Sequence, residues 1–291
     1  MKLLAAFLLL IPLCVAQAEL RLGMVGGDSA LVTAFTQILN DPSHPDHVPG
    51  ARVVAAYRGG RVDKTGEELR SKWKVEITPD VGSLCRRVDA VLIGAAAPAE
   101  RMERIQTVIA AGKPMFFESP LAGTLDEAKA VVKLANDSGL RWFSASAVRF
   151  GQLGEIRGSF LRGATVWGPG PVEQSVPVAE MLYAILGIGC EEAAYAEGPA
   201  ISGHWSGDRK GTARAGASTE AKWGALVIRS ENTPQSKVAV APDHRLLLAE
   251  IVKFFEGGSP PVSSQETLEV FSFLDAAQRS KAAAGAPMKL R

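Results

Sequence analysis

The alternation of strand-like and helix-like segments between residues 20 and 146 constrains the fold of this chain more than any other feature. Short apolar runs at residues 20–26 and 88–93 are each followed by an amphipathic segment, at residues 29–40 and 99–111. Such runs are typical of strands buried on both faces of a parallel sheet. Strands that alternate with helices over short connections predict an α/β domain with a doubly wound parallel sheet and right-handed crossovers.

Further strands are expected at residues 52–57, 114–117 and 141–146. A capping box, Thr124-Leu125-Asp126-Glu127, predicts the start of a helix, and Gly139 is expected to end it. Ligands bind at the carboxyl ends of the strands in such sheets. The stretch FFESP, residues 116–120, is therefore predicted to leave its strand at a functional site.

After residue 146 the sequence becomes rich in glycine and turn residues, with short β-like runs such as KWGALVIRS and KVAVA. Helices are expected at residues 178–186, 244–255 and 265–284. This pattern predicts a smaller α+β domain with an open, mainly antiparallel sheet. The expected division is a leader at 1–18, the α/β domain at 19–146 and the α+β domain at 147–291, with the last helix packing back on the first domain.

The first 18 residues have the three parts of a secretory signal peptide. Met1-Lys2 is a short basic start, residues 3–15 are an apolar run broken by Pro12, and Ala16-Gln17-Ala18 fits the cleavage rule. The run is too short to span a membrane. We expect export to the periplasm or the medium after cleavage near Ala18, with a buried N-terminal helix as the alternative.

The charge content argues against a nucleic-acid partner, and the cysteine content argues against a fold held by disulfides. The chain has 32 basic and 31 acidic residues, and loss of Lys2 with the leader leaves 31 of each, so no net field attracts nucleic acid. Cys85 and Cys190 are the cysteines outside the leader. An oxidising compartment permits a bridge between them, but we expect two separate buried thiols. No spacing of His, Cys and carboxylates indicates a metal site.

The segment GMVGGDSA, residues 23–30, predicts a glycine-rich turn between the first strand and the first helix. Such a turn lets backbone N–H groups approach a pyrophosphate at a helix N-terminus. Gly23, Gly26 and Gly27 would contact it, although their spacing departs from G-x-G-x-x-G and Asp28 would repel phosphate. A tight turn that binds nothing is the alternative.

The second strand leads into Tyr57-Arg58-Gly59-Gly60-Arg61, where dinucleotide-binding domains usually place an acid for the adenosine ribose. Arg58 at this position suits the 2′-phosphate of NADP better than the ribose of NAD. The alternative is a solvated loop with two arginines. The sequence also leaves a further alternative, a chain that binds no nucleotide.

Four ordered segments resemble the Gfo/Idh/MocA family, the relatives of glucose-fructose oxidoreductase and inositol dehydrogenase. They are the glycine turn, the stretch from IGAAAPAERMERIQ to LANDSG, PVAEMLYAILGIG, and the tail from EIVKFFEGG to AAAGAP. The resemblance implies a Rossmann domain that binds NAD or NADP, action on a hydroxyl of a sugar-like or cyclic polyol substrate, and homo-oligomerisation through the second sheet. It also places Ala97, Pro98, Glu118 and Pro120 beside the cofactor.

The chain departs from the family at its catalytic positions. The family's Glu-Lys-Pro corresponds to Glu118-Ser119-Pro120, so a short, uncharged hydroxyl replaces the lysine. The two histidine positions hold Met102 and Pro177. The chain also passes from Phe150 to Gly154 almost directly where relatives insert a helix, so one wall of the substrate cleft is expected to be absent.

Few side chains are left to accept the proton that oxidation of a carbinol releases. The candidates are Ser119, Glu180, Tyr183 and His204. Glu180 and Tyr183 lie one helical turn apart, and His204 belongs to the loop GHWSGDRKGT. As alternatives, Glu180 caps or pairs locally, the Tyr183 ring packs in the core, and His204 is a structural histidine held by a hydrogen bond. Two functions follow: an exported NAD(P)-dependent oxidoreductase, or an inactive relative that serves as a carbohydrate-binding or assembly protein.

Overall fold

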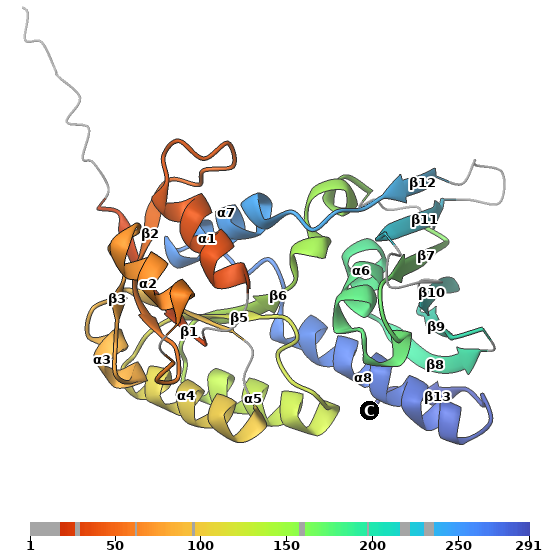
Figure 1. Ribbon diagram of the computed structural model, residues 1–291. Coiled ribbons are helices and arrows are strands. Elements are labelled where there is room, and N and C mark those ends of the chain that lie inside the picture. The colour runs from red at the N-terminus through yellow and green to blue at the C-terminus, as the bar shows by residue number, and fades with distance from the viewer. Residues whose placement is uncertain are drawn as a thin grey trace, which may run out of the picture.

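A computed structural model of the protein describes residues 18–26, 30–61, 63–94, 97–156, 161–196, 198–215, 222–229 and 236–291. Two β-sheets organise these residues, and helices pack against both (Figure 1). The expected signal peptide, apart from Ala18, and Gly27 lie outside the described residues. Among the helices in these ranges, none combines the length and apolar character needed to span a membrane.

The first sheet is parallel and has the strand order β3-β2-β1-β4-β5-β6. Its strands are β1 (Leu20–Val25), β2 (Ala51–Tyr57), β3 (Glu76–Ile77), β4 (Ala90–Ile93), β5 (Met115–Glu118) and β6 (Trp142–Ala145). This is the doubly wound sheet that the alternating pattern predicted. The order reverses between β1 and β4, so the crevice for a ligand lies at the carboxyl ends of these strands.

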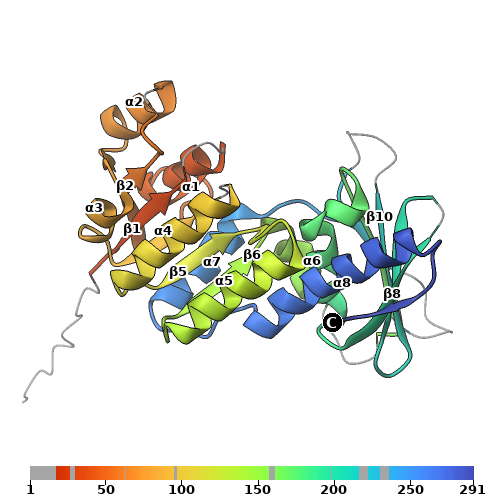
Figure 2. The same cartoon turned by 90° about the horizontal axis from the view of Figure 1, so that it is seen from below.

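Helices cover both faces of this sheet. They are α1 (Ala30–Asn40), α2 (Lys64–Ser71), α3 (Val81–Cys85), α4 (Pro98–Ala110) and α5 (Leu125–Asp137). Helices α4 and α5 run side by side on one face, and α1 lies on the other (Figure 2). Thr124 caps α5 as predicted, because Glu127 N donates to Thr124 Oγ1 at 3.2 Å. The return bond of the capping box is shifted by one residue, since Glu127 Oε2 accepts from Gly123 N at 2.9 Å.

A helix from the C-terminal half completes the first sheet. Helix α7 (His244–Phe255) packs beside α1 on the same apolar core. The ring of Phe254 lies edge-on to Phe143 of β6, with centroids 4.9 Å apart, and Arg141 Nη2 donates to Phe254 O at 2.7 Å. Residues far apart in the sequence therefore share one core.

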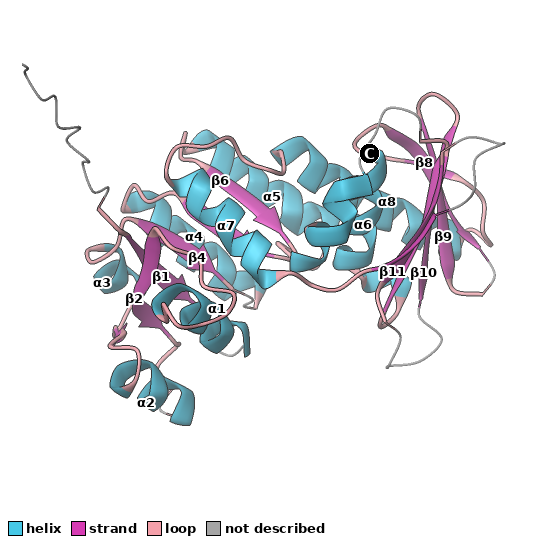
Figure 3. Cartoon of the chain, turned by 90° about the horizontal axis from the view of Figure 1, so that it is seen from above, coloured by secondary structure: helices cyan, strands magenta, loops and turns pink. Residues whose placement is uncertain are grey.

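The second sheet is mixed and mostly antiparallel, with the order β12-β11-β7-β10-β9-β8-β13. Its strands are β7 (Gly163–Gly168), β8 (Cys190–Ala196), β9 (Ala200–Trp205), β10 (Arg209–Ala215), β11 (Gly224–Ile228), β12 (Ser236–Ala239) and β13 (Met288–Lys289). Only β7 and β10 pair in parallel. Helices α6 (Val176–Leu186) and α8 (Ser264–Ala282) cover the face turned toward the first sheet (Figure 3).

The junction between the two halves is short and well packed. Two 3-10 turns, η1 (Ala147–Arg149) and η2 (Gly151–Ile156), follow β6 where relatives were expected to insert a helix. Helix α8 contacts both α5 and α6 and so joins the halves. Cys85 and Cys190 are both buried and unpaired.

Candidate functional site

The carboxyl ends of β1, β4 and β5 converge where the strand order reverses. Gly26 follows β1 with φ 98°, a conformation that favours glycine. Gly94 follows β4, and a Cβ atom there would lie 3.3 Å from Glu118 Oε2 and 3.6 Å from Gly26 O. The turn after β1 and the last residue of β5 therefore meet at a single point of the sheet edge.

Glu118 is the titratable group at this point. Its surroundings are mainly apolar and include Met24, Phe35, Leu92 and Phe116. Among the described residues, no side chain or backbone group forms a hydrogen bond or ion pair with its carboxyl group. Burial without a partner disfavours the charged form and raises the pKa of Glu118 to about 7. The Glu118 carboxyl group therefore retains a proton at higher pH than an exposed glutamate does, a property that the sequence did not reveal.

Gly23 has a packing role and does not belong to the phosphate turn, contrary to the sequence interpretation. It lies inside β1, and a Cβ atom there would sit 2.5 Å from Leu84 Cδ2 of α3. Gly26 is thus the first glycine of the turn. Counted from it, G-x-G-x-x-G requires glycine at the positions of Asp28 and Leu31. Asp28 lies outside the described residues, and Leu31 is half-buried beside Glu118.

Ser119 follows Glu118 directly at the end of β5. Its Oγ is buried and has no hydrogen-bond partner among the described residues, while Pro120 follows through a cis peptide bond. The hydroxyl lies near Glu180 of α6 and lowers the pKa of its carboxyl group, although no hydrogen bond is formed between them. The position of the family's lysine therefore faces the junction between the halves.

Glu180 is a fully buried link across that junction. It accepts hydrogen bonds from Ser146 N at 2.9 Å and from Ser146 Oγ. Arg149 Nη1 donates to Glu180 O at 3.1 Å, and the same guanidinium forms an ion pair with Glu266 of α8. Burial raises the pKa of Glu180, and the charge of Arg149 opposes that rise. Through these hydrogen bonds, Glu180 joins the end of β6 and η1 to α6.

Tyr183 and His204 lie elsewhere. The Tyr183 ring is buried against Trp205 and Phe273, and its hydroxyl donates to Glu269 O at 3.2 Å. Burial raises the pKa of Tyr183 well above its ordinary value. His204 lies on β9 with its Nε2 3.4 Å from Asp208 Oδ1. The structure brings Ser119 and Glu180 together but places Tyr183 in the core and His204 on the distant sheet.

The other predicted cofactor contacts lie at the expected edge. Ala97 is the residue before α4 and Pro98 is its first residue, so both follow the carboxyl end of β4. Within the described ranges, no three His, Cys, Asp or Glu side chains are gathered to hold a metal ion.

A cavity of about 410 Å³ lies beside the end of β2, between the starts of α3 and α4. Tyr57 and Gly59 line it, but Arg58 does not. The Arg58 side chain is 2% exposed and pairs bidentately with Asp63, the N-cap of α2. The residue that the sequence assigned to a 2′-phosphate instead fastens α2 to the end of β2.

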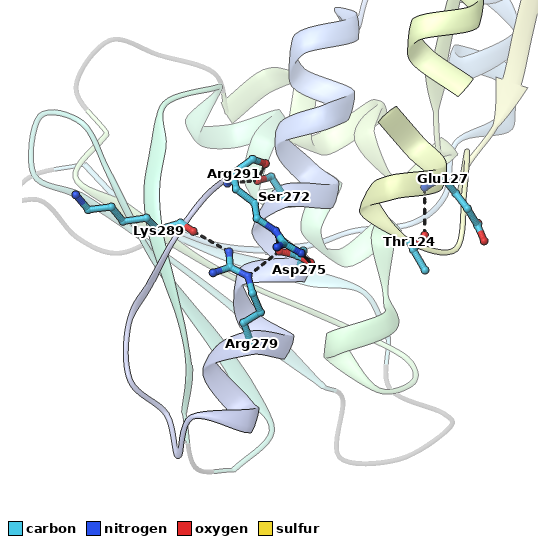
Figure 4. A network of polar contacts seen from close by, with 7 residues as sticks. All are labelled: Thr124, Glu127, Ser272, Asp275, Arg279, Lys289 and Arg291. Carbon is cyan, nitrogen blue, oxygen red and sulfur yellow. Dashed lines mark hydrogen bonds and ion pairs between the residues drawn. The ribbon is translucent and has the colours of Figure 1, made fainter. Parts of the chain in front are cut away.

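A groove of about 480 Å³ lies beyond Pro120, between the N-termini of α5 and α6 and the middle of α8. Its apolar lining includes Ala122, Leu125, Val176, Phe271 and Leu274, and its polar lining includes Thr124, Asp126, Gln174, Asp275 and Gln278. Figure 4 shows Asp275 paired with Arg279 at 2.8 Å and Arg291 at 3.0 Å, beside the start of α5. Polar groups around an apolar floor suit a small hydroxylated ligand.

These features define a class: a two-sheet protein whose first sheet is a Rossmann fold with its crevice at the strand-order switch. Residues 20–146 match the model of the GFO_IDH_MocA family, described as an oxidoreductase family with an NAD-binding Rossmann fold. Residues 20–146 are thus similar to the Rossmann domain of that family. No curated protein matches the chain.

Solved structures share the fold over nearly the whole chain. Scyllo-inositol dehydrogenase from Lactobacillus casei, with bound NAD(H) and scyllo-inositol, has 11% identity and a TM-score of 0.72, covering 94% of this chain and 99% of its own. Myo-inositol 2-dehydrogenase from Lactobacillus plantarum has 14% identity and a TM-score of 0.72, covering 94% and 100%. GenD2 from gentamicin A biosynthesis, in complex with NAD, has 14% identity and a TM-score of 0.71, covering 97% and 99%.

The crevice fits a dinucleotide better at its ends than at its centre. The cavity beside β2 has room for an adenosine, and Glu118 stands at the end of β5, on the other side of the strand-order switch. At the centre, Gly26 keeps the required backbone conformation, but Asp28 and Leu31 replace two glycines. Of the three glycine positions counted from Gly26, the chain thus keeps the first and replaces the other two.

Proposed function

We propose that this protein is an exported NAD(P)-dependent oxidoreductase of the Gfo/Idh/MocA type that acts on a hydroxyl of a sugar-like or cyclic polyol substrate. The family match over residues 20–146 and the inositol dehydrogenases among its structural neighbours support this proposal. The observation that carries it is Glu118, an unpartnered carboxyl group that titrates near neutrality at the end of β5.

Glu118 acts as the proton acceptor in this proposal. Oxidation of a carbinol requires a base whose pKa lies near the working pH, and the pKa of Glu118, about 7, meets that condition. A bound nicotinamide supplies the hydride acceptor. Gly26 and the first turn of α1 hold the phosphates, while Tyr57 and Gly59 border the adenosine. The uncovered face of the second sheet is the proposed contact between copies of the chain.

The test is reduction of NAD and NADP by the purified chain with a panel of cyclic polyols and aldoses. We expect kcat/KM for oxidation to rise with pH through about 7, because only ionised Glu118 accepts a proton. Glu118→Gln should lower kcat by a factor of about 100 or more while nucleotide still binds. Turnover in the wild-type chain that is unchanged in the variant would exclude this role for Glu118.

A second candidate function is supported by the buried hydroxyl of Ser119. The position that corresponds to the family's lysine holds a short, uncharged hydroxyl near Glu180, as expected of a relative that has lost turnover. Such a protein would bind a carbohydrate, for which the groove beyond Pro120 offers room and polar groups. Binding of a sugar without turnover, with no thermal shift from millimolar NAD or NADP, would favour this function.

A further inference from the structure

We infer that the cavity beside the end of β2 selects NAD over NADP, because carboxylates surround the place of the adenosine ribose. This inference rests on the proposed function and reverses the NADP preference that Arg58 suggested in the sequence. The residues that carry it are Asp80, Glu100, Glu103 and Arg104, which line the cavity together with Tyr57 and Gly59.

Arg58 is committed to another partner. Its guanidinium is buried beside Gly66 and held by both carboxylate oxygens of Asp63, whose Oδ1 also accepts the Gly66 N–H at 3.0 Å. The pair lowers the pKa of Asp63 to about 2, so the carboxylate stays charged at neutral pH. A 2′-phosphate at the cavity would have to draw Arg58 from this pair and leave Asp63 and the start of α2 without their partner.

Arg104 is the only cation among the described residues that line the cavity, and it is already paired. Its Nη2 lies 2.8 Å from Glu100 Oε2, and its guanidinium carbon lies 5.6 Å from the centroid of the Tyr57 ring. The guanidinium therefore already has an anionic and an aromatic partner. Among the lining residues, one positive charge is thus set against the three carboxylates of Asp80, Glu100 and Glu103. Arg86, which does not line the cavity, is a further cation near Asp80.

The carboxylates distinguish the two nucleotides through charge. Asp80 accepts hydrogen bonds from Ser83 N at 2.6 Å and Ser83 Oγ at 2.8 Å, which lower its pKa and keep it ionised. Glu103 is exposed, and its carboxylate has no ion pair in the described part of the chain. A ribose presents hydroxyl donors to such oxygens, whereas a 2′-phosphate adds a charge of about −2 to a site that is already negative.

Calorimetric titration of the full chain with NAD and with NADP tests the inference. We expect NAD to bind at least about 10-fold more tightly at low salt, with a smaller difference at high salt because screening weakens the repulsion. Glu103→Arg should tighten NADP binding about 10-fold and leave NAD binding within about 3-fold. The control is Glu191→Arg, an exposed glutamate on β8 of the second sheet, which should change neither affinity.

The outcomes separate this inference from the proposed function. Binding of NADP equal to or tighter than that of NAD would overturn the selectivity alone. An unchanged NADP affinity in Glu103→Arg would show that the adenosine ribose does not lie in this cavity. Failure of both nucleotides to bind would remove the proposed function and the inference together.

Discussion

The Ser119 hydroxyl and the Glu180 carboxylate face each other across the junction between the two sheets. Ser119 follows β5 of the first sheet, and Glu180 lies on α6, which covers the second. Ser146 donates two hydrogen bonds to the same carboxylate. Ser146 is thus hydrogen-bonded to the buried Glu180 carboxylate and Ser119 is not. The contributions of the two hydroxyls to stability can therefore be compared.

Ser119→Ala should leave the free energy of unfolding unchanged or raise it by up to ~1 kcal/mol, because it removes a buried hydroxyl without a partner. Ser146→Ala is the matched comparison and should lower that free energy by ~1–3 kcal/mol, since it removes a hydrogen bond to a carboxylate. Urea unfolding of both variants gives the answer. Equal losses would show that Ser119 does bond Glu180.

Glu118 should make stability fall as pH rises. Burial raises its pKa from the ordinary 4.5 to about 7 in the fold. Between these values the folded chain retains a proton that the unfolded chain releases, so the free energy of unfolding decreases from pH 4.5 to 7 and the loss is complete above 7. The loss is on the order of 3 kcal/mol at most.

Glu118→Gln should remove this pH dependence and raise the free energy of unfolding at pH 8 by ~2–3 kcal/mol. Denaturant unfolding at pH 5 and pH 8, for the wild type and the variant, measures both effects. If the two proteins lose stability in parallel between these pH values, Glu118 does not titrate near neutrality and cannot serve as the proposed base.

Gly23→Ala should lower the free energy of unfolding by ~1–3 kcal/mol without changing nucleotide affinity. The added methyl would meet Leu84 in a packed core, away from the turn. Gly26→Ala is the matched variant: it forces a side chain into positive φ at the turn itself and should weaken nucleotide binding as well. A nucleotide affinity that falls in Gly23→Ala would return this glycine to the phosphate site.

The sequence predicted the buried strands and the amphipathic helices well because each carries its own periodic signal. Strand β4 and helix α7 lie within two residues of their expected bounds. Elements α2, β3 and α3 were not predicted. Helix α2 buries only Gly66 and Leu69, and β3 has two residues, so neither has a periodic pattern of apolar residues from which it could be predicted.

Strand ends also located the site, because parallel strands present their carboxyl ends at one edge. The directions of the side chains could not be predicted. Whether Arg58 points to solvent or to Asp63, and whether Ser119 faces the crevice or Glu180, depends on contacts between separate elements. The sequence also could not predict which sheet α7 covers, because the contact between Phe254 and Phe143 joins residues more than a hundred positions apart.

Asp28→Gly should tighten binding of NAD by a factor of about 3–10. The substitution removes a carboxylate from the segment proposed to hold the pyrophosphate and restores glycine at the second position of the motif counted from Gly26. Calorimetry at low and high salt separates the charge from the backbone effect, and Asp28→Asn isolates the charge. An affinity that does not change in either variant would place the phosphates away from this turn.

Phe254→Ala should lower the free energy of unfolding by ~3–5 kcal/mol, because it empties a fully buried position in the core that α7 shares with the first sheet. The ring contacts Phe143, and the guanidinium of Arg141 stacks over it with its carbon 4.5 Å from the ring centroid. Phe255→Ala, one residue later and only half-buried, is the control and should cost less than half as much. Urea unfolding followed by tryptophan fluorescence reports both variants. Similar small losses in the two would mean that α7 is not part of the first sheet's core, and the N-terminal half would then have to be stable without it.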